Sequence, residues 1–182
     1  MDEFTAGERS MLLLEPFDGD GKHGDGHVVG VATRGECHSG SKLLHPVVHL
    51  HVFNSRGEVY LQKRPEWKDI QPGKWDTSVG GHVDYGEQIA EAAERECREE
   101  LGIDGVKPEL LYSYVWKSER ERELVYVHRL IYDGPFNLDP TELDDGRFWS
   151  KEEIETAHQD LFTPNFLYDY GRLIDFFERK GY

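Results

Sequence analysis

Glutamates at helical spacing are the residues of this chain with the clearest chemical meaning. Residues 95–100 read Arg-Glu-Cys-Arg-Glu-Glu, which places carboxylates at Glu96, Glu99 and Glu100. Because an α-helix has about 3.6 residues per turn, these carboxylates fall within an arc of about 100° on one face. Like charges at this spacing repel one another, and a hard divalent cation, which prefers carboxylate oxygens, would relieve the repulsion. The spacing therefore predicts a metal site on a helix.

The helix that carries these glutamates is expected over residues 87–101, with Gly102 in the position that ends it. The glutamate arc borders the apolar stripe of the helix, so the carboxylates should lie where the helix meets the rest of the domain. Burial of several anions is unfavourable without a counter-charge. A solvated acidic face is the ordinary alternative, but the glycines on both sides of the helix favour a metal site. The apolar stripe is expected to comprise Ala90, Ala93, Cys97 and Leu101.

Strands surround this helix in the predicted order of elements. Residues 64–77, rich in Pro, Gly, Trp and Lys, are expected to form a loop. Ser150 with Glu153 forms a capping box for a second helix. Thr163, followed by Pro164, is the expected N-cap of a third helix over residues 164–180. We therefore expect one α/β (α+β) domain over residues 1–182, with a mixed sheet and an N-terminal hairpin over residues 10–34. The predicted strands are residues 11–17, 28–33, 47–53, 58–63, 110–116 and 124–132, and a short strand that ends at Trp149.

The charge of the chain limits the classes of partner. The 182 residues carry a formal net charge of −15, from 36 acidic against 21 basic residues. Nucleic-acid polymers and anionic membranes would be repelled, whereas a small phosphorylated ligand is compatible if metal ions screen its charge. Two cysteines are too few for a disulfide scaffold and favour a reducing, cytoplasmic location. The apolar run at residues 11–14 is too short for a signal peptide or a membrane span.

Residues 81–103 resemble the Nudix box of the Nudix hydrolase superfamily. That motif reads Gly, five residues, Glu, seven residues, Arg-Glu, an aliphatic residue, any residue, Glu-Glu, any residue, Gly and an aliphatic residue. Cys97 stands where an aliphatic residue is usual, and a small buried hydrophobe suits that position. The matching positions are Gly81, Glu87, Arg95, Glu96, Glu99, Glu100, Gly102 and Ile103.

The resemblance implies a metal site in an α/β/α sandwich, Mg²⁺ or Mn²⁺ as cofactor, and attack of water on a diphosphate. By the same resemblance Glu96, Glu99 and Glu100 would hold the cations, near the backbone carbonyl of Gly81. Glu96 is the favoured base, although the base varies within the superfamily. Arg95 and Glu87 would form the ion pair that orients the helix. Homodimers are frequent in the superfamily, so a homodimer is compatible with the resemblance.

Five further residues of metal-binding type follow a second pattern. An ordered series between residues 34 and 82 resembles isopentenyl-diphosphate isomerase and the Nudix hydrolases most similar to it. In those isomerases three histidines and two glutamates form a metal site. For any one of the histidines alone, an ordinary core or surface position is the alternative. The resemblance implies a second metal site made of His38, His45, His82, Glu121 and Glu123.

Basic residues accompany this second pattern. Arg34 lies four residues before His38, and Arg64 and Lys68 bracket a loop. In the isomerases such positions clamp the diphosphate, which suits guanidinium geometry. Ordinary surface charges are the alternative. We expect Arg34, Arg64 and Lys68 to bind the substrate.

One position separates a hydrolase from an isomerase. The isomerases carry a catalytic cysteine two residues before the histidine matched by His82, and this chain has Gly80 there. Without that thiol, proton transfer at the two faces of an allylic carbon loses one acid–base partner. We therefore expect a metal-dependent pyrophosphatase that cleaves the diphosphate linkage of a small metabolite, of nucleoside or prenyl type, by water attack at phosphorus. Isopentenyl-diphosphate isomerisation and a catalytically silent diphosphate-binding module are the alternatives.

Two other groups of residues are assigned to packing. His49 and His51 alternate along the strand over residues 47–53, and we expect them to pack or to line a pocket wall without binding metal. Core packing is also expected for several aromatic residues, with stacking against a substrate as the alternative. These aromatic residues are Trp67, Trp75, Tyr112, Tyr114 and Trp116.

Overall fold

The computed structural model describes residues 10–14, 28–68, 70–138, 141 and 143–181. Residues 15–17 of the first predicted strand, and the loop predicted to follow it, lie outside the described residues. The strands are β1 (Ser10–Leu14), β2 (Val28–Thr33), β3 (Leu44–Phe53), β4 (Val59–Lys63), β5 (Trp75–Asp76), β6 (Val79–His82), β7 (Glu109–Lys117), β8 (Arg122–Ile131) and β9 (Asp145–Trp149). The helices are α1 (Arg34–Cys37), α2 (Ile89–Leu101), α3 (Lys151–Thr156) and α4 (Pro164–Lys180), with a short 3₁₀ turn at Gln159–Leu161.

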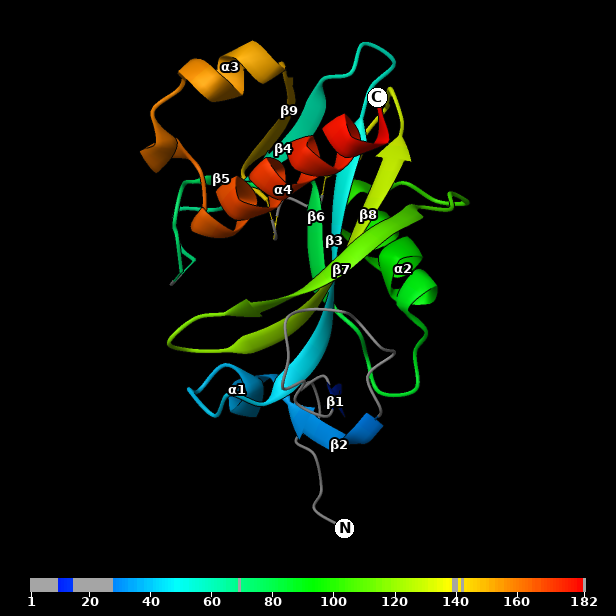
Figure 1. The fold of residues 1–182 in the computed structure, drawn as a ribbon, viewed down its shortest axis with the longest axis vertical. Coiled ribbons are helices and arrows are strands. Elements are labelled where there is room, and N and C mark those ends of the chain that lie inside the picture. Colours follow the sequence, from blue (N-terminus) through cyan, green and yellow to red (C-terminus); the bar gives the residue numbers. More distant parts are fainter. Residues whose placement is uncertain (1–9, 15–27, 69, 139–140, 142, 182) are drawn as a thin grey trace.

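Seven of these strands form one mixed sheet, as the sequence predicts (Figure 1). Its main path runs β5-β4-β3-β8-β7, with β6 paired to β3 and β9 paired to β4. The pair β3 and β8 is parallel, and the other pairs are antiparallel. The strands β1 and β2 pair separately as an antiparallel hairpin. The mixed α+β architecture with few helices is therefore confirmed.

The loop predicted over residues 64–77 contains one short strand that the sequence did not predict. Trp75 and Asp76 pair with Lys63 and Gln62 at the edge of the sheet. A strand of two residues shows no alternation, so only its pairing with β4 reveals it.

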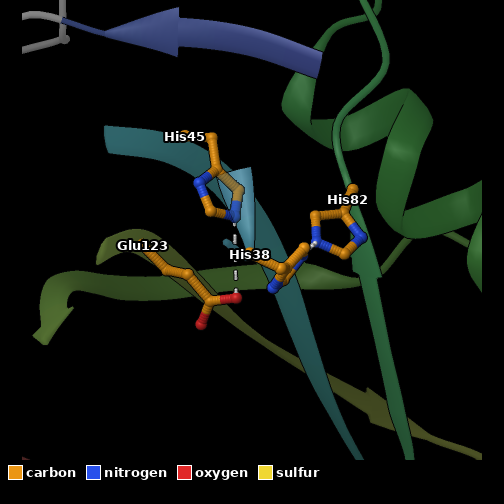
Figure 2. Close-up of side chains that lie close together, drawn as sticks. All are labelled: His38, His45, His82 and Glu123. Atoms are coloured by element: carbon orange, nitrogen blue, oxygen red, sulfur yellow. Dashed lines mark hydrogen bonds and ion pairs between the residues drawn. The ribbon is translucent and has the colours of Figure 1, made fainter. Parts of the chain in front are cut away.

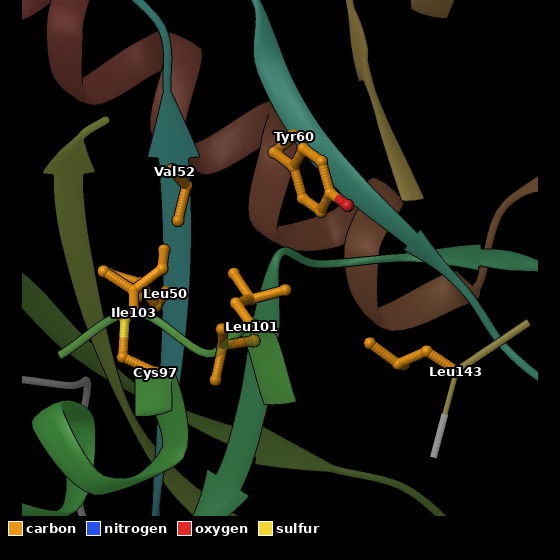
Figure 3. Close-up of a cluster of buried hydrophobic side chains, with 8 residues drawn as sticks. Leu50, Val52, Tyr60, Cys97, Leu101, Ile103 and Leu143 are labelled. Carbon is orange, nitrogen blue, oxygen red and sulfur yellow. The ribbon is translucent and has the colours of Figure 1, made fainter. Parts of the chain in front are cut away.

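The central strand β3 separates two layers by the alternation of its side chains. Leu50 and Val52 point toward α2 and pack with Cys97 and Leu101 in a buried cluster that also contains Tyr60, Ile103 and Leu143 (Figure 3). The histidines at odd positions of the same strand point to the opposite face, where α4 lies. There His49 and His51 contact Asp169 of α4. The odd-numbered face of β3 thus presents polar groups to a buried layer.

Helix α2 begins later than the sequence predicts. Gln88 is its N-cap and Ile89 its first residue, so Glu87 lies in the preceding loop. Gly102 ends the helix with φ of 65°, a left-handed conformation that glycine adopts without strain. The prediction that Ala90 belongs to the apolar stripe of this helix is wrong, because Ala90 is exposed. The buried face of the helix includes Ala92 and Glu96 instead. The burial of Ala93, Cys97 and Leu101 is confirmed.

The predicted caps of the later helices are confirmed. Ser150 and Glu153 form the capping box of α3, and Thr163 caps α4 with Pro164 in its first turn. Within the described part of the chain, every helix is too short or too polar to cross a membrane.

Candidate active site

Arg95 of helix α2 makes hydrogen bonds to the loop that precedes the helix and to neighbouring glutamates. Its Nε and Nη2 donate to the two carboxylate oxygens of Glu87 at 2.8 and 3.0 Å, and Nη2 also donates to the carbonyl oxygen of His82 at 2.9 Å. Its Nη1 donates to Glu96 at 2.7 Å and to Glu99 at 3.1 Å. These contacts, led by Glu87, hold the pKa of Arg95 well above its usual range. The ion pair expected between Arg95 and Glu87 is therefore present, and it joins the loop, the helix and strand β6.

Gly81 makes room for one of the predicted ligands. A Cβ atom added at this residue would lie 2.0 Å from Cδ of Glu96, far inside van der Waals contact. Glu96 is 5% exposed, so its carboxylate is held between Gly81 and Arg95. The glycine that the motif requires is thus explained by close approach of the helix to the strand.

Replacing Gly81 with alanine is expected to lower kcat by about a hundredfold, because Glu96 must swing away and displacement of an active-site group by about 1 Å has effects of this size. Steady-state kinetics over a range of Mg²⁺ concentrations would measure the loss. Gly171→Ala on α4 is the matched control, since an added Cβ there meets no atom within 4 Å. Unchanged kinetics in Gly81→Ala would show that the position of Glu96 does not matter.

Glu100 lies where burial disfavours its charge. It accepts hydrogen bonds from Nε2 of Gln62, at 3.2 Å, and from the backbone N–H of Gly80. Burial, and secondarily repulsion by Glu96, raises the pKa of the Glu100 carboxyl to about 8. Glu96, Glu99 and Glu100 offer only oxygen atoms as ligands, are partly buried, and carry more negative charge than Arg95 offsets. Such a set fits a hard divalent cation.

The histidines of the second predicted site come together beside Glu123 (Figure 2). Nε2 of His38 lies 2.8 Å from Nε2 of His82, and Nε2 of His45 lies 3.7 Å from Oε1 of Glu123. Ligand atoms of these four residues all lie within 4.8 Å of one another. Nε2 of His45 is buried and makes no hydrogen bond to any of the described residues. Four converging ligand atoms, one of them a buried nitrogen without a hydrogen bond, fit a divalent metal ion.

Hydrogen bonds orient two of these histidines. Nδ1 of His45 donates to the carbonyl oxygen of Leu43 at 3.1 Å, which leaves Nε2 as the nitrogen that would bind a metal ion. Glu121 contacts Nδ1 of His38, and this contact holds the pKa of Glu121 below its usual range. In this structure Glu121 therefore contacts His38 and is not one of the four clustered residues, whereas the resemblance implies that it is a metal ligand.

The three predicted substrate-binding cations lie in different environments. Arg34 is exposed in the first turn of α1. Nη1 of Arg64 pairs with Asp76 at 3.2 Å, and its Nε donates to the carbonyl oxygen of Ile70. Nζ of Lys68 lies 4.9 Å from the ring centre of exposed Trp67. The structure thus leaves Arg34 accessible and places Arg64 in an ion pair.

His49, for which the sequence predicts a packing or pocket-wall role, lies beside Gly80 and contacts a buried acid. Nδ1 of His49 is 2.5 Å from Oδ2 of Asp169, and Oδ1 of Asp169 accepts from the hydroxyl of Tyr114. Asp169 is fully buried. One signal existed in the sequence, because Asp169 stands on the stripe of α4 that also buries Phe166 and Leu173. An acidic residue on an apolar stripe indicates a buried partner.

The family model of the NUDIX domain matches residues 43–169 of this chain. A Nudix hydrolase of Yersinia pestis is 38% identical over 126 residues, which are 69% of each chain. An isopentenyl-diphosphate Delta-isomerase of Photorhabdus laumondii is 28% identical over 155 residues, 80% of this chain and 88% of that protein.

Among solved structures, DR0079 of Deinococcus radiodurans shares the fold. It superposes with a TM-score of 0.64 and 25% identity, covering 80% of this chain and 85% of its own.

Proposed function

This chain belongs to the Nudix family, and on that premise we propose that it hydrolyses the diphosphate linkage of a small phosphorylated metabolite of nucleoside or prenyl type. The observation that carries the proposal is the arrangement around Arg95. One guanidinium binds Glu87 and the backbone of β6, and it also contacts Glu96 and Glu99 beside partly buried Glu100. This arrangement supports a metal-binding carboxylate site rather than a solvated acidic face.

Glu96, Glu99 and Glu100, with the carbonyl of Gly81, would hold Mg²⁺ or Mn²⁺. When bound, such ions neutralise diphosphate oxygens and lower the pKa of coordinated water. The protein's own contribution is to hold the carboxylates in place before the substrate arrives. Arg95 does this for Glu96 and Glu99, and Gln62 with the Gly80 amide does it for Glu100. One of these carboxylates, with Glu96 favoured, would take the proton of the attacking water.

A second metal ion would be held by His38, His45, His82 and Glu123, with Glu121 orienting His38. Imidazole nitrogens suit transition-type ions such as Zn²⁺ better than they suit Mg²⁺. Arg34, Arg64 and Lys68 are proposed to contact the phosphate groups of the substrate. In a chain of net charge −15, local cations are needed to offset an anionic substrate.

A phosphate-release screen over a panel of diphosphates, with Mg²⁺ and with Mn²⁺, tests the proposal. The panel should contain nucleotide sugars, nucleoside di- and triphosphates, dinucleotides, thiamine diphosphate and prenyl diphosphates. We expect metal-dependent cleavage of at least one class, abolished by EDTA. Absence of cleavage throughout, with ligand binding retained, would instead support the silent binding module.

Isopentenyl-diphosphate isomerisation is the second candidate, favoured by the assembled histidine cluster and by the Photorhabdus laumondii relative. Gly80 weighs against it, since no thiol stands at that position. Incubation with isopentenyl diphosphate and Mg²⁺ is expected to form no dimethylallyl diphosphate, as followed by NMR. Formation of that product would make the isomerase the better assignment.

A further inference from the structure

We propose that His49 is a further substrate-binding residue, whose charged imidazole donates its Nε2–H to an oxygen of the phosphate chain. The proposal rests on the proposed diphosphate hydrolysis and adds to that site a residue from the face of β3 opposite α2.

The partners of His49 require a positive charge. Asp169 is fully buried, with Oδ2 at 2.5 Å from Nδ1 of His49 and 3.6 Å from Nε2 of His51. Its other oxygen accepts from Tyr114. No lysine or arginine among the described residues forms an ion pair with Asp169. Because an unpaired buried carboxylate is strongly unfavourable, the compensating proton belongs on the imidazole at hydrogen-bond distance, which is that of His49.

The ring of His49 points its second nitrogen toward Gly80. The two residues are paired across β3 and β6. A Cβ atom added at Gly80 would lie 3.7 Å from Cδ2 and 4.0 Å from Nε2 of His49. The His49 side chain is 11% exposed, and its Nε2 makes no hydrogen bond to any residue that the structure describes. Glycine at position 80 therefore leaves this N–H uncovered.

Gly80, beside this uncovered edge, belongs to a strand that touches both proposed metal sites. The backbone amide of Gly80 binds Glu100, and His82, two residues further along β6, belongs to the histidine cluster. A ligand that spans the two sites would pass the Nε2 atom of His49. A charged N–H donor is a strong partner for a phosphate oxygen.

The groups that face His49 from neighbouring elements favour its charged form. They are Asp169 from α4, Glu123 from β8 and Asp76 from β5. Tyr114 from β7 and His51 from the same strand contact Asp169 instead. Arg172 stacks on the ring of Tyr114, with its guanidinium carbon 4.8 Å from the ring centre. Burial alone lowers the pKa of His49, but attraction to these acids, Asp169 first, raises it to about 9.

Two substitutions of His49 distinguish a role in substrate binding from a role in holding Asp169. His49→Asn keeps an amide near Nδ1 for Asp169 but removes the donor at Nε2, whereas His49→Gln can place an amide near Nε2. His51→Asn is the matched control, because it changes the other imidazole at Asp169 and no group that faces Gly80. The probe is imidodiphosphate with Mg²⁺, a diphosphate that resists hydrolysis, and its affinity is measured by calorimetry.

We expect His49→Asn to weaken imidodiphosphate binding roughly tenfold, the size of one lost charged hydrogen bond, with a smaller loss in His49→Gln. The control should bind within about twofold of the unsubstituted protein if its fold is retained. In ¹⁵N NMR at pH 7.5, both nitrogens of His49 should be protonated, and Nε2 should shift when the probe is added.

Equal binding by His49→Asn and the unsubstituted protein would overturn the proposal, as would a neutral His49 in the NMR spectrum. Both results would leave the hydrolase assignment intact, because the diphosphate screen decides that independently. Circular dichroism of each variant excludes loss of fold as the cause of weaker binding, and the NMR measurement needs no variant.

Discussion

Replacing Glu100 with glutamine is expected to lower kcat by about a thousandfold, since it removes a charged metal ligand worth several kcal/mol in the transition state. Glutamine has nearly the same shape, so packing around the side chain should not change. Burial raises the pKa of the Glu100 carboxyl to about 8, which means that the folded protein already disfavours this charge. The neutral amide should therefore leave the melting temperature unchanged or raise it.

Steady-state kinetics with the substrate found in the screen, together with thermal melting followed by circular dichroism, would measure both effects. Glu94→Gln is the matched control, because Glu94 lies exposed on the same helix and should not affect turnover. Near-normal kcat in Glu100→Gln would remove this residue from the site. Loss of activity accompanied by a large fall in melting temperature would point to a structural role instead.

Replacing Asp169 with asparagine is expected to lower the free energy of unfolding by about 3 kcal/mol near pH 6, the cost of breaking a buried charge pair. Asp169 joins α4 to β3 through His49 and to β7 through Tyr114, so its carboxylate holds two layers together. An amide of the same shape keeps the volume but loses the charge that matches the imidazole.

This loss should depend on pH in a defined direction. The pKa of His49 is raised to about 9, above its unfolded value of about 6.5, so its contribution is complete below about pH 6.5 and disappears as pH rises through 9. The pKa of Asp169 is lowered by His49 against the effect of burial, so its contribution is present above its unfolded value of about 4 and is lost in acid. The stability difference should therefore be largest between about pH 5 and 6.5.

Urea unfolding at pH 5.5, 7.0 and 9.5, with EDTA present, would measure the difference between the two proteins. Asp175→Asn, at an exposed position of the same helix, should show no such dependence. A difference that is as large at pH 9.5 as at pH 5.5 would contradict the assignment of the charge to His49.

The features that the sequence determined by itself are those encoded over a few neighbouring residues. The spacing from Gly81 to Ile103 was sufficient to predict helix α2 and its end at Gly102, because helical geometry relates such positions directly. The contact between Arg95 and Glu87 was implied only by the resemblance, since Glu87 lies outside the helix. The capping signals of α3 and α4 worked for the same reason. The histidine cluster was predicted only by resemblance, because its members come from distant segments of the chain.

The tertiary structure decided which side chains meet across long separations. Alternation along β3 places His49 and His51 on one face, but only the docking of α4 brings Asp169, 120 residues away, to His49. Likewise, the pairing of β3 with β6 decides that His49 faces Gly80, since two glycines carry no signal of strand register. Local periodicity records which face of an element is buried, whereas the partner that covers that face follows from packing of the whole chain.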